Sequence, residues 1–193
     1  MDLTPDTLLS LGLGLGLAAA AGFRVFVPLL VLSLAARYGY VPLSPGWEWV
    51  GTPAATLTFA SATVLEVIAY YVPWLDHVLD AVATPAAVVA GMVMTASVLG
   101  DLPPLLKWTA VVIGGGGAAA LVQGSTVALR AGSGATTAGL ANPVVATAEL
   151  VGSTATALLA IVLPLLALAL VVGFFVVVYR VTRRLFRRRG AAA

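Results

Sequence analysis

The sequence predicts an all-α protein that crosses a membrane several times, and three observations carry this prediction. Of the 193 residues, 61% are hydrophobic and only 9% are charged, and the mean hydropathy is +1.06. Soluble domains carry about 25% charged residues, and a chain of this size has too little interior to hide so much apolar surface from water. The composition also excludes disorder. The lack of cysteine removes disulfides, thiolate metal sites and cysteine nucleophiles.

The first apolar stretch, residues 8–36, is too long for one straight membrane helix. Its 29 residues would extend about 43 Å as a helix, against about 30 Å of hydrocarbon in a bilayer. Gly22 and Pro28 flank Arg24 and favour a break there. We therefore expect one helix to end near Ala21 and a second to extend from Arg24 to Ala36. Residues 38–52, rich in Pro, Gly, Tyr and Trp, predict an interfacial loop.

The middle of the chain predicts one full-length span and one short one. Residues 53–72 form an apolar run that carries Glu66. A short polar piece with Asp76 and Asp80 then leads to an apolar run at 85–99, which begins at proline and has only 15 residues. Short apolar segments beside proline are typical of discontinuous helices.

The C-terminal part predicts the remaining spans. Residues 105–129 form a span that the glycines at 114–117 interrupt, and Arg130 ends it. After a small, polar stretch at 131–142, an apolar piece holds Glu149, and residues 154–179 are the longest run, with Pro164 inside it. In total we expect a polytopic membrane helix bundle of about six to seven membrane segments, some half-length or broken.

The basic residues are concentrated at the C-terminus. Residues 1–179 carry four basic and eight acidic groups, and we expect them to form a single transmembrane domain. Residues 180–193 form a basic tail, which the positive-inside rule places in the cytoplasm. The pattern indicates a lipid bilayer as partner and argues against nucleic acid. The tail holds six of the ten basic residues of the chain: Arg180, Arg183, Arg184, Arg187, Arg188 and Arg189.

The two halves of the domain, residues 8–100 and 104–179, predict an internal repeat. The segment 60–66, which ends at Glu66, resembles 143–149, which ends at Glu149, and each half supplies one arginine, Arg24 or Arg130. Internal repeats of this kind occur in many transporters. Similarity between small residues also arises easily in an alanine-rich chain, so both interpretations stay open.

Four segments together resemble a known family over nearly the whole chain. They are 21–28 (AGFRVFVP), 66–76 (EVIAYYVPWLD), Asp80 with Thr84-Pro85, and 139–149 (GLANPVVATAE). The chain resembles the bacterial membrane family called domain of unknown function 4126, although it has Tyr70-Tyr71 where many members carry Asp-Lys. The resemblance implies a multi-pass protein of the bacterial inner membrane and no particular activity.

Two carboxylates lie inside predicted spans, where a charge costs at least about 2.5 kcal/mol. Glu66 and Glu149 therefore need partners, and Arg24 and Arg130 are the basic residues able to pair with them at membrane depth. Asn142 adds an uncharged ligand to this polar site. One interpretation is a pair of structural ion pairs, and the other is a gated path in which a carboxylate exchanges its arginine for a proton or cation.

Asp76 and Asp80 lie four residues apart, on one face of a helix, and with Glu66 form a candidate cation site. The alternative is that Asp76 caps a helix and Asp80 faces water. No metal is identified and no cofactor is expected, because the only histidine, His77, is a weak metal signal. The chain offers no nucleophile and base set, so we expect no enzyme.

The best functional prediction is a small transporter or channel for protons or a small cation. A homo-oligomer is a further expectation. The alternative is a structural or assembly protein that transports nothing and whose charges only pair. Water around Glu66 and Glu149 would favour transport, and direct Arg–Glu contacts would favour the structural role.

Overall fold

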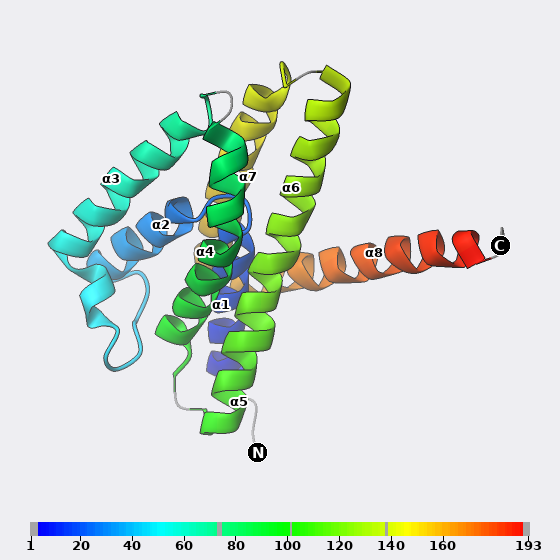
Figure 1. Ribbon diagram of the computed structural model, residues 1–193. Coiled ribbons are helices and arrows are strands. Elements are labelled where there is room, and N and C mark those ends of the chain that lie inside the picture. Colours follow the sequence, from blue (N-terminus) through cyan, green and yellow to red (C-terminus); the bar gives the residue numbers. More distant parts are fainter. Residues whose placement is uncertain (1–3, 73–74, 101, 138, 191–193) are drawn as a thin grey trace.

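The computed structural model describes residues 4–190 apart from 73–74, 101 and 138, and it leaves out the side chains of 75–78, 182 and 184–190. All regular elements in these ranges are helical, as predicted (Figure 1). They follow in the order α1 (Pro5–Ala21), α2 (Phe26–Arg37), a 3₁₀ turn η1 (Glu48–Gly51), α3 (Pro53–Ala69), α4 (Leu75–Val98), α5 (Pro104–Thr109), a π-helical turn η2 (Ala110–Gly116), α6 (Gly117–Thr137), α7 (Asn142–Val162) and α8 (Pro164–Gly190).

Four apolar stretches within the described helices are long enough to cross a membrane. They are Leu79–Val98, Pro104–Thr137, Asn142–Val162 and Pro164–Val181. The second of them joins α5, η2 and α6 into one continuous helix of 34 residues. The helices α1, α2 and α3 are apolar but shorter. The sequence predicts a mixture of full-length and short apolar helices, but in the middle of the chain it assigns the two lengths the wrong way round. The segment 53–72, expected to be a full-length span, forms the shorter helix α3, whereas α4 contains a stretch long enough to cross.

The break after α1 lies where the sequence places it. Thr4 caps the start of α1 by accepting from the backbone N–H of Thr7 at 3.3 Å, and Pro5 occupies the first turn. At the other end, Gly22 lies against α6. A Cβ atom there would meet the Val122 Cβ at 2.5 Å and the Ala119 carbonyl oxygen at 2.6 Å. Glycine is therefore required for α1 to end in contact with α6.

Three expectations about helix boundaries are wrong. Pro85 lies inside α4 and does not start a half-length segment, because one lost backbone bond is outweighed by the packing of α4 along α1. The glycines at 114–117 do not interrupt the span but form a π-helical turn, where Gly115 approaches Thr95. The run 154–179 is divided, because Leu163 precedes proline and leaves the helical conformation at φ −135° and ψ 66°.

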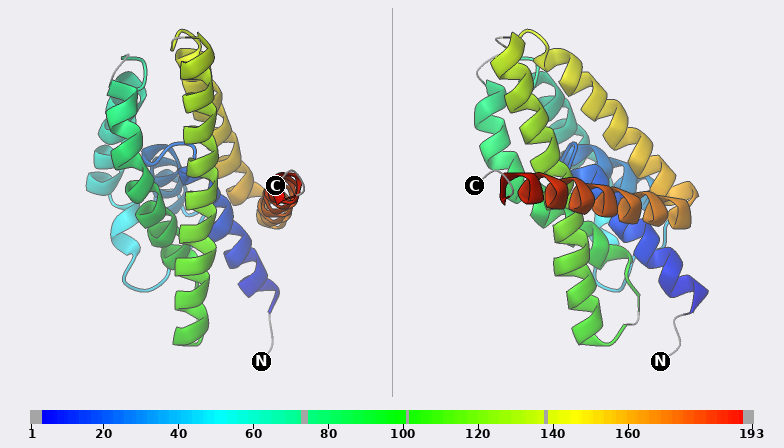
Figure 2. Two further views of the ribbon diagram at one scale, coloured as in Figure 1. Left: turned by 45° about the vertical axis from the view of Figure 1, so that its right-hand side comes forward. Right: turned by 90° about the vertical axis from the view of Figure 1, so that its right-hand side faces the viewer.

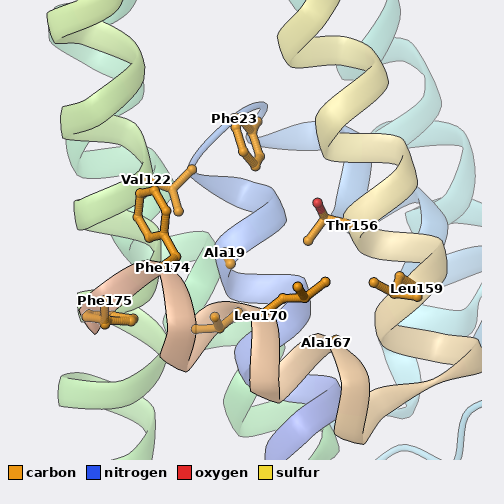
Figure 3. Close-up of a pocket in the computed structure, with 10 residues that line it drawn as sticks. Ala19, Phe23, Val122, Thr156, Leu159, Ala167, Leu170, Phe174 and Phe175 are labelled. Carbon is orange, nitrogen blue, oxygen red and sulfur yellow. The ribbon is translucent and has the colours of Figure 1, made fainter. Parts of the chain in front are cut away.

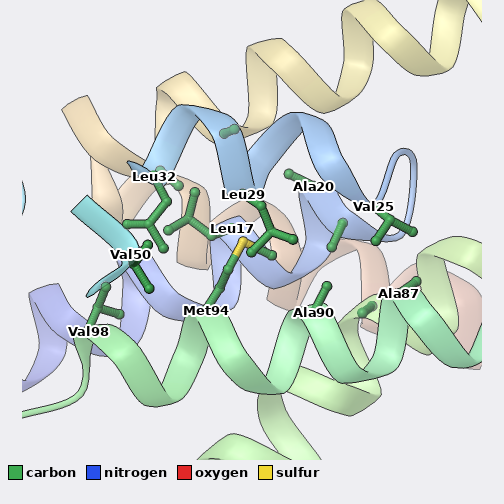
Figure 4. Close-up of a cluster of buried hydrophobic side chains, with 14 of the residues drawn as sticks. Leu17, Ala20, Val25, Leu29, Leu32, Val50, Ala87, Ala90, Met94 and Val98 are labelled. Carbon is green, nitrogen blue, oxygen red and sulfur yellow. The ribbon is translucent and has the colours of Figure 1, made fainter. Parts of the chain in front are cut away.

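The core surrounds α1, which contacts α4, α7 and α8 along its length. Figure 4 shows Leu17 of α1, Leu32 of α2 and Met94 of α4 in one cluster, and all three are fully buried. Small residues of α1 also lie in the interior, since Ala18, Ala20 and Ala21 are fully buried. In lipid, the hydrophobic effect does not drive helices together. Small side chains let the helices approach closely, so that van der Waals packing holds them.

The last helix has a different course from the rest. In both views of Figure 2, α8 runs crosswise to α6, and in Figure 1 its C-terminal part extends away from the bundle. Its first turns pack on α1, where Pro164 lies against Gly12 and Ala167 against Gly16, and the helix also contacts α7. Its apolar surface is exposed, for example at Val172 and Val177, as expected for a helix that lipid surrounds.

Candidate functional site

Four helices and the break between α1 and α2 bring six polar or aromatic side chains together in the interior, and we call these side chains the polar cluster. Arg24 comes from the break between α1 and α2, and the others come from α3 or its end, α4, α6 and α7. The residues Arg130 and Glu149 each lie seven positions, about 10 Å, from the connection between α6 and α7. The cluster thus lies toward one end of the bundle. Its members are Arg24, Glu66, Tyr70, Asp80, Arg130 and Glu149.

Arg130 connects three helices through its guanidinium group. Its Nε donates to Oε1 of Glu149 at 2.9 Å, and its Nη2 donates to Oε2 of the same carboxylate. Its Nη1 donates to Oδ1 of Asp80 at 2.8 Å. A fork of this kind on one carboxylate is the strongest geometry that arginine offers. The ion pair predicted between an arginine and Glu149 is therefore present, and Asp80 joins it.

Arg24 approaches the same carboxylate from the other side of the bundle core. Its Nη2 donates to the Ala146 carbonyl oxygen at 2.9 Å and lies 3.5 Å from Oε2 of Glu149. Only 2% of the residue is exposed. Its Nε and Nη1 have no hydrogen-bond acceptor among the described residues. Arg24 is held more loosely than Arg130, although it is more deeply buried.

Glu66 binds backbone, whereas an arginine partner was expected. Its Oε1 accepts from the N–H of Val25 at 2.8 Å, and its Oε2 accepts from the N–H of Phe26 at 3.1 Å. These N–H groups lie at the start of α2, where a helix carries unsatisfied donors and a partial positive charge. The Glu66 carboxylate therefore satisfies two backbone donors that the break between α1 and α2 would otherwise leave without an acceptor in the interior.

Tyr70 occupies the space between the charges. The guanidinium carbon of Arg24 lies 3.8 Å from the centroid of the Tyr70 ring, and that of Arg130 lies 4.0 Å from it. The phenol donates to Oδ1 of Asp80 at 3.2 Å. Cations favour aromatic faces, most of all away from water. Sequence reasoning missed Tyr70, although its spacing of four residues from Glu66 places both on one helix face.

The remaining predicted residues have mixed outcomes. Asn142 is buried at the start of α7, about 10 Å along the helix from Glu149. Asp80 contacts Arg130 and Tyr70 and does not simply face water. The side chain of Asp76 lies outside the described part of the chain, so the cation site of Asp76 and Asp80 stays a prediction. The described residues contain no group of three metal-ligating side chains.

The cluster concentrates charge in the interior. It contains two arginines and three carboxylates. Four of these residues, Arg24, Glu66, Arg130 and Glu149, are at most 8% exposed. Charge at such a place is costly unless it is paired. A change in the protonation of one member therefore changes the balance of the whole cluster.

An apolar hollow lies near the break that carries Arg24. It encloses about 160 Å³ where α8 crosses α1, α6 and α7, and its walls are almost entirely apolar (Figure 3). Phe23 lies in its wall, directly before Arg24 in the chain. The break thus directs one side chain into the polar cluster and its neighbour into an apolar pocket.

Comparison with known proteins gives one match. The family described as "Domain of unknown function (DUF4126)" matches residues 11–184, which is most of the chain and includes the whole polar cluster. No curated protein and no solved structure matches the chain.

Proposed function

Since the chain belongs to the DUF4126 family, whose description assigns no chemistry, we propose a function from the polar cluster: the protein is a small membrane transporter or channel that moves protons or a small monovalent cation. The observation that carries this proposal is the buried carboxylate of Glu66, which binds backbone N–H groups at the break between α1 and α2 and has no arginine within salt-bridge distance among the described residues. Such a carboxylate inside a membrane protein is a candidate carrier of a proton or cation.

The roles within the cluster follow from how firmly each group is held. Glu66 and Glu149 are the carriers, because both are buried and each can exchange its present partners for a proton or cation. Arg130 is fixed by three hydrogen bonds, whereas Arg24 touches Glu149 only at 3.5 Å. Arg24 is therefore the group that moves when Glu149 changes its charge. Asn142 supplies an uncharged ligand near the α6–α7 end.

The break between α1 and α2 supports a transport path rather than a site that only packs helices together. Irregular backbone is tolerated within a membrane where it lies inside protein or lines a cavity, and transporters place their sites at such breaks. Here the break between α1 and α2 lies directly against the buried carboxylate of Glu66. Protonation of Glu66 would weaken its hold on the start of α2 and so link proton binding to the helix break.

The proposed setting is the bacterial inner membrane, with the C-terminus in the cytoplasm and the bilayer as partner. The arginines that follow α8, among them Arg180 and Arg183, support this orientation. A cytoplasmic reporter fused after Ala193 should be active, and activity of a reporter that works only in the periplasm would refute it. A homo-oligomer stays a prediction.

Flux measurements on purified protein in liposomes test the proposal. We expect the wild type to move protons or a monovalent cation down an imposed gradient, and Glu66→Gln and Glu149→Gln to stop this flux. Glu48→Gln is the matched control, because it makes the same change at an exposed carboxylate. Helix content by circular dichroism must match the wild type, so that lost flux is not lost fold.

One specific observation favours the alternative of a structural or assembly protein. The forked contact of Arg130 with Glu149, together with Asp80, ties α4, α6 and α7 into a fixed arrangement. If the wild-type protein moves no proton, metal cation or small anion in liposomes, the structural role replaces transport.

A further inference from the structure

A second apolar hollow lies between α2 and α7, beside the C-terminal ends of both helices. Its volume is about 360 Å³, more than twice the roughly 150 Å³ of an engineered cavity that binds benzene. It can therefore hold several carbons of a hydrocarbon chain. Its apolar walls come from Val31, Leu34 and Ala35 of α2 and from Leu158, Ile161 and Val162 of α7.

The end of α2 turns back and adds an aromatic wall to this hollow. Gly39 has a φ of +77°, its N–H donates to the carbonyl oxygen of Ala36 at 3.1 Å, and the N–H of Tyr40 donates to that of Ala35 at 2.8 Å. These two bonds with a left-handed glycine between them form a Schellman motif. The motif brings Tyr40 back beside Ala35, and both residues line the hollow.

Two tyrosines mark the mouth of the hollow. Tyr38 and Tyr40 line it although 70% and 77% of these residues are exposed. Tyrosines that place an apolar ring against hydrocarbon and a hydroxyl in water are typical of the level of the lipid headgroups. The hollow thus has an apolar body and a mouth suited to the headgroup region.

Arg37 supplies a positive charge beside this mouth. It directly precedes Tyr38 and is exposed. Among the described residues, none forms an ion pair or a side-chain hydrogen bond with it. Glu48, on the turn η1 that contacts α2, instead accepts from the N–H of Gly46 at 3.1 Å. The guanidinium group of Arg37 therefore has donors to offer, and their planar fork matches a phosphate group.

We propose that the hollow between α2 and α7 binds one anionic phospholipid, with part of an acyl chain in the hollow and the phosphate on Arg37. Charge complementarity selects this occupant. An apolar helix of a second copy would fill the hollow but leave Arg37 without an acceptor, and a zwitterionic lipid would bring an ammonium group that arginine repels. The proposal does not depend on transport, because none of these residues belongs to the polar cluster.

Photolabelling of the full chain in phosphatidylcholine nanodiscs tests the site. The discs contain a small share of a lipid probe with a diazirine in one acyl chain and either a phosphatidylglycerol or a phosphatidylcholine headgroup. We expect the glycerol probe to label the peptides of 31–36 and 158–163 about fivefold more, the effect of one basic residue at an anionic membrane surface. Unlabelled phosphatidylglycerol should compete for this labelling in a saturable way. Labelling of the exposed surface of α8 at 172–177 should not saturate.

Variants separate the chain site from the headgroup site. Leu158→Trp and Val162→Trp each fill the hollow from a half-exposed or exposed position and should abolish the saturable labelling. Leu170→Trp is the matched control, because it makes the same change at an exposed leucine of the hollow beneath α8 and should have no effect. Arg37→Gln should remove the preference for the glycerol probe, whereas Arg180→Gln, at another exposed arginine, should keep it.

The outcomes decide the occupant. Equal labelling by the two probes in the wild type, or a preference that survives Arg37→Gln, would overturn the proposal. Saturable labelling that survives both tryptophan variants would place the lipid elsewhere and also overturn it. A cross-link between two copies of the chain through 158–163, without lipid labelling there, would assign the hollow to a second copy instead. Saturable labelling without any proton or cation flux keeps the lipid site and counts only against transport.

Discussion

The middle of α1 and the break beyond its C-terminal end are held in the bundle by opposite means. Along the middle of α1, glycines bring backbones together: a Cβ at Gly12 would clash with the Pro164 carbonyl oxygen, and a Cβ at Gly16 would meet the Ala160 Cβ at 2.6 Å. We call this contact of α1 with α7 and α8 the glycine seam. Beyond the C-terminal end of α1, Arg24 and the polar cluster join segments through charge.

The difference lies in what each contact responds to. The glycine seam depends on shape alone, so it is the same at every pH and with every bound ion. The polar cluster depends on charge, and one proton or cation changes its balance. A membrane protein that only needed to fold could be held together by glycine packing throughout. Burying the charges of the polar cluster is costly, and we therefore assign function to that part of the bundle.

The largest effect should come from removing one side of the polar cluster. Arg130→Gln leaves Glu149 and Asp80 without their forked and bridging contacts, and breaking a buried pair costs roughly 3–5 kcal/mol. The measurement is the midpoint of thermal unfolding in detergent, read as loss of helix by circular dichroism. The double variant Arg130→Gln/Glu149→Gln should recover much of the loss. A cycle that shows no coupling between the two positions would contradict the ion pair.

A smaller effect should come from the glycine seam. Gly12→Ala places a Cβ against a backbone oxygen, and overpacking of this kind costs about 1–3 kcal/mol. Gly117→Ala is the matched control, because a Cβ there meets nothing within 4 Å and alanine favours a helix by up to about 1 kcal/mol. The two variants should therefore shift the thermal midpoint in opposite directions. If Gly12→Ala raised the midpoint as Gly117→Ala should, the seam would tolerate the added methyl group.

The comparison also separates what local sequence determines from what it does not. The break at Gly22 and Arg24 follows from nearby residues, and the all-α class follows from composition. The short length of α3 does not, because the segment 53–72 is apolar enough to suggest a full-length span. The outcome at Pro85 depends on packing against α1, and a proline rule applied to the segment alone misjudges it.

The members of the polar cluster show the same limit. Pairing of arginine with Glu149 follows from the cost of buried charge and was predictable. The partners of Glu66 and the place of Tyr70 depend on how α2, α3 and α6 meet, which residues far apart in the chain decide. A tyrosine also carries no charge that would mark it as part of an ionic site, so only its helical spacing from Glu66 indicates its role.

The smallest effect should come from the edge of the cluster, at Tyr70. Tyr70→Phe keeps the ring under Arg24 and Arg130 but removes the hydroxyl that donates to Asp80 at 3.2 Å. One hydrogen bond to a charged group contributes about 1.5–3 kcal/mol when ideal, and this long bond, to a carboxylate that Arg130 also binds, should contribute less. Tyr70→Leu removes the ring as well and should cost a further amount of about 0.5–2 kcal/mol. The thermal midpoints should thus fall in the order wild type, Tyr70→Phe, Tyr70→Leu. If Tyr70→Phe were as unstable as Tyr70→Leu, the ring would add nothing and the hydrogen bond to Asp80 would account for the contribution of Tyr70. The polar cluster would then depend on that hydrogen bond rather than on cations stacked on an aromatic ring.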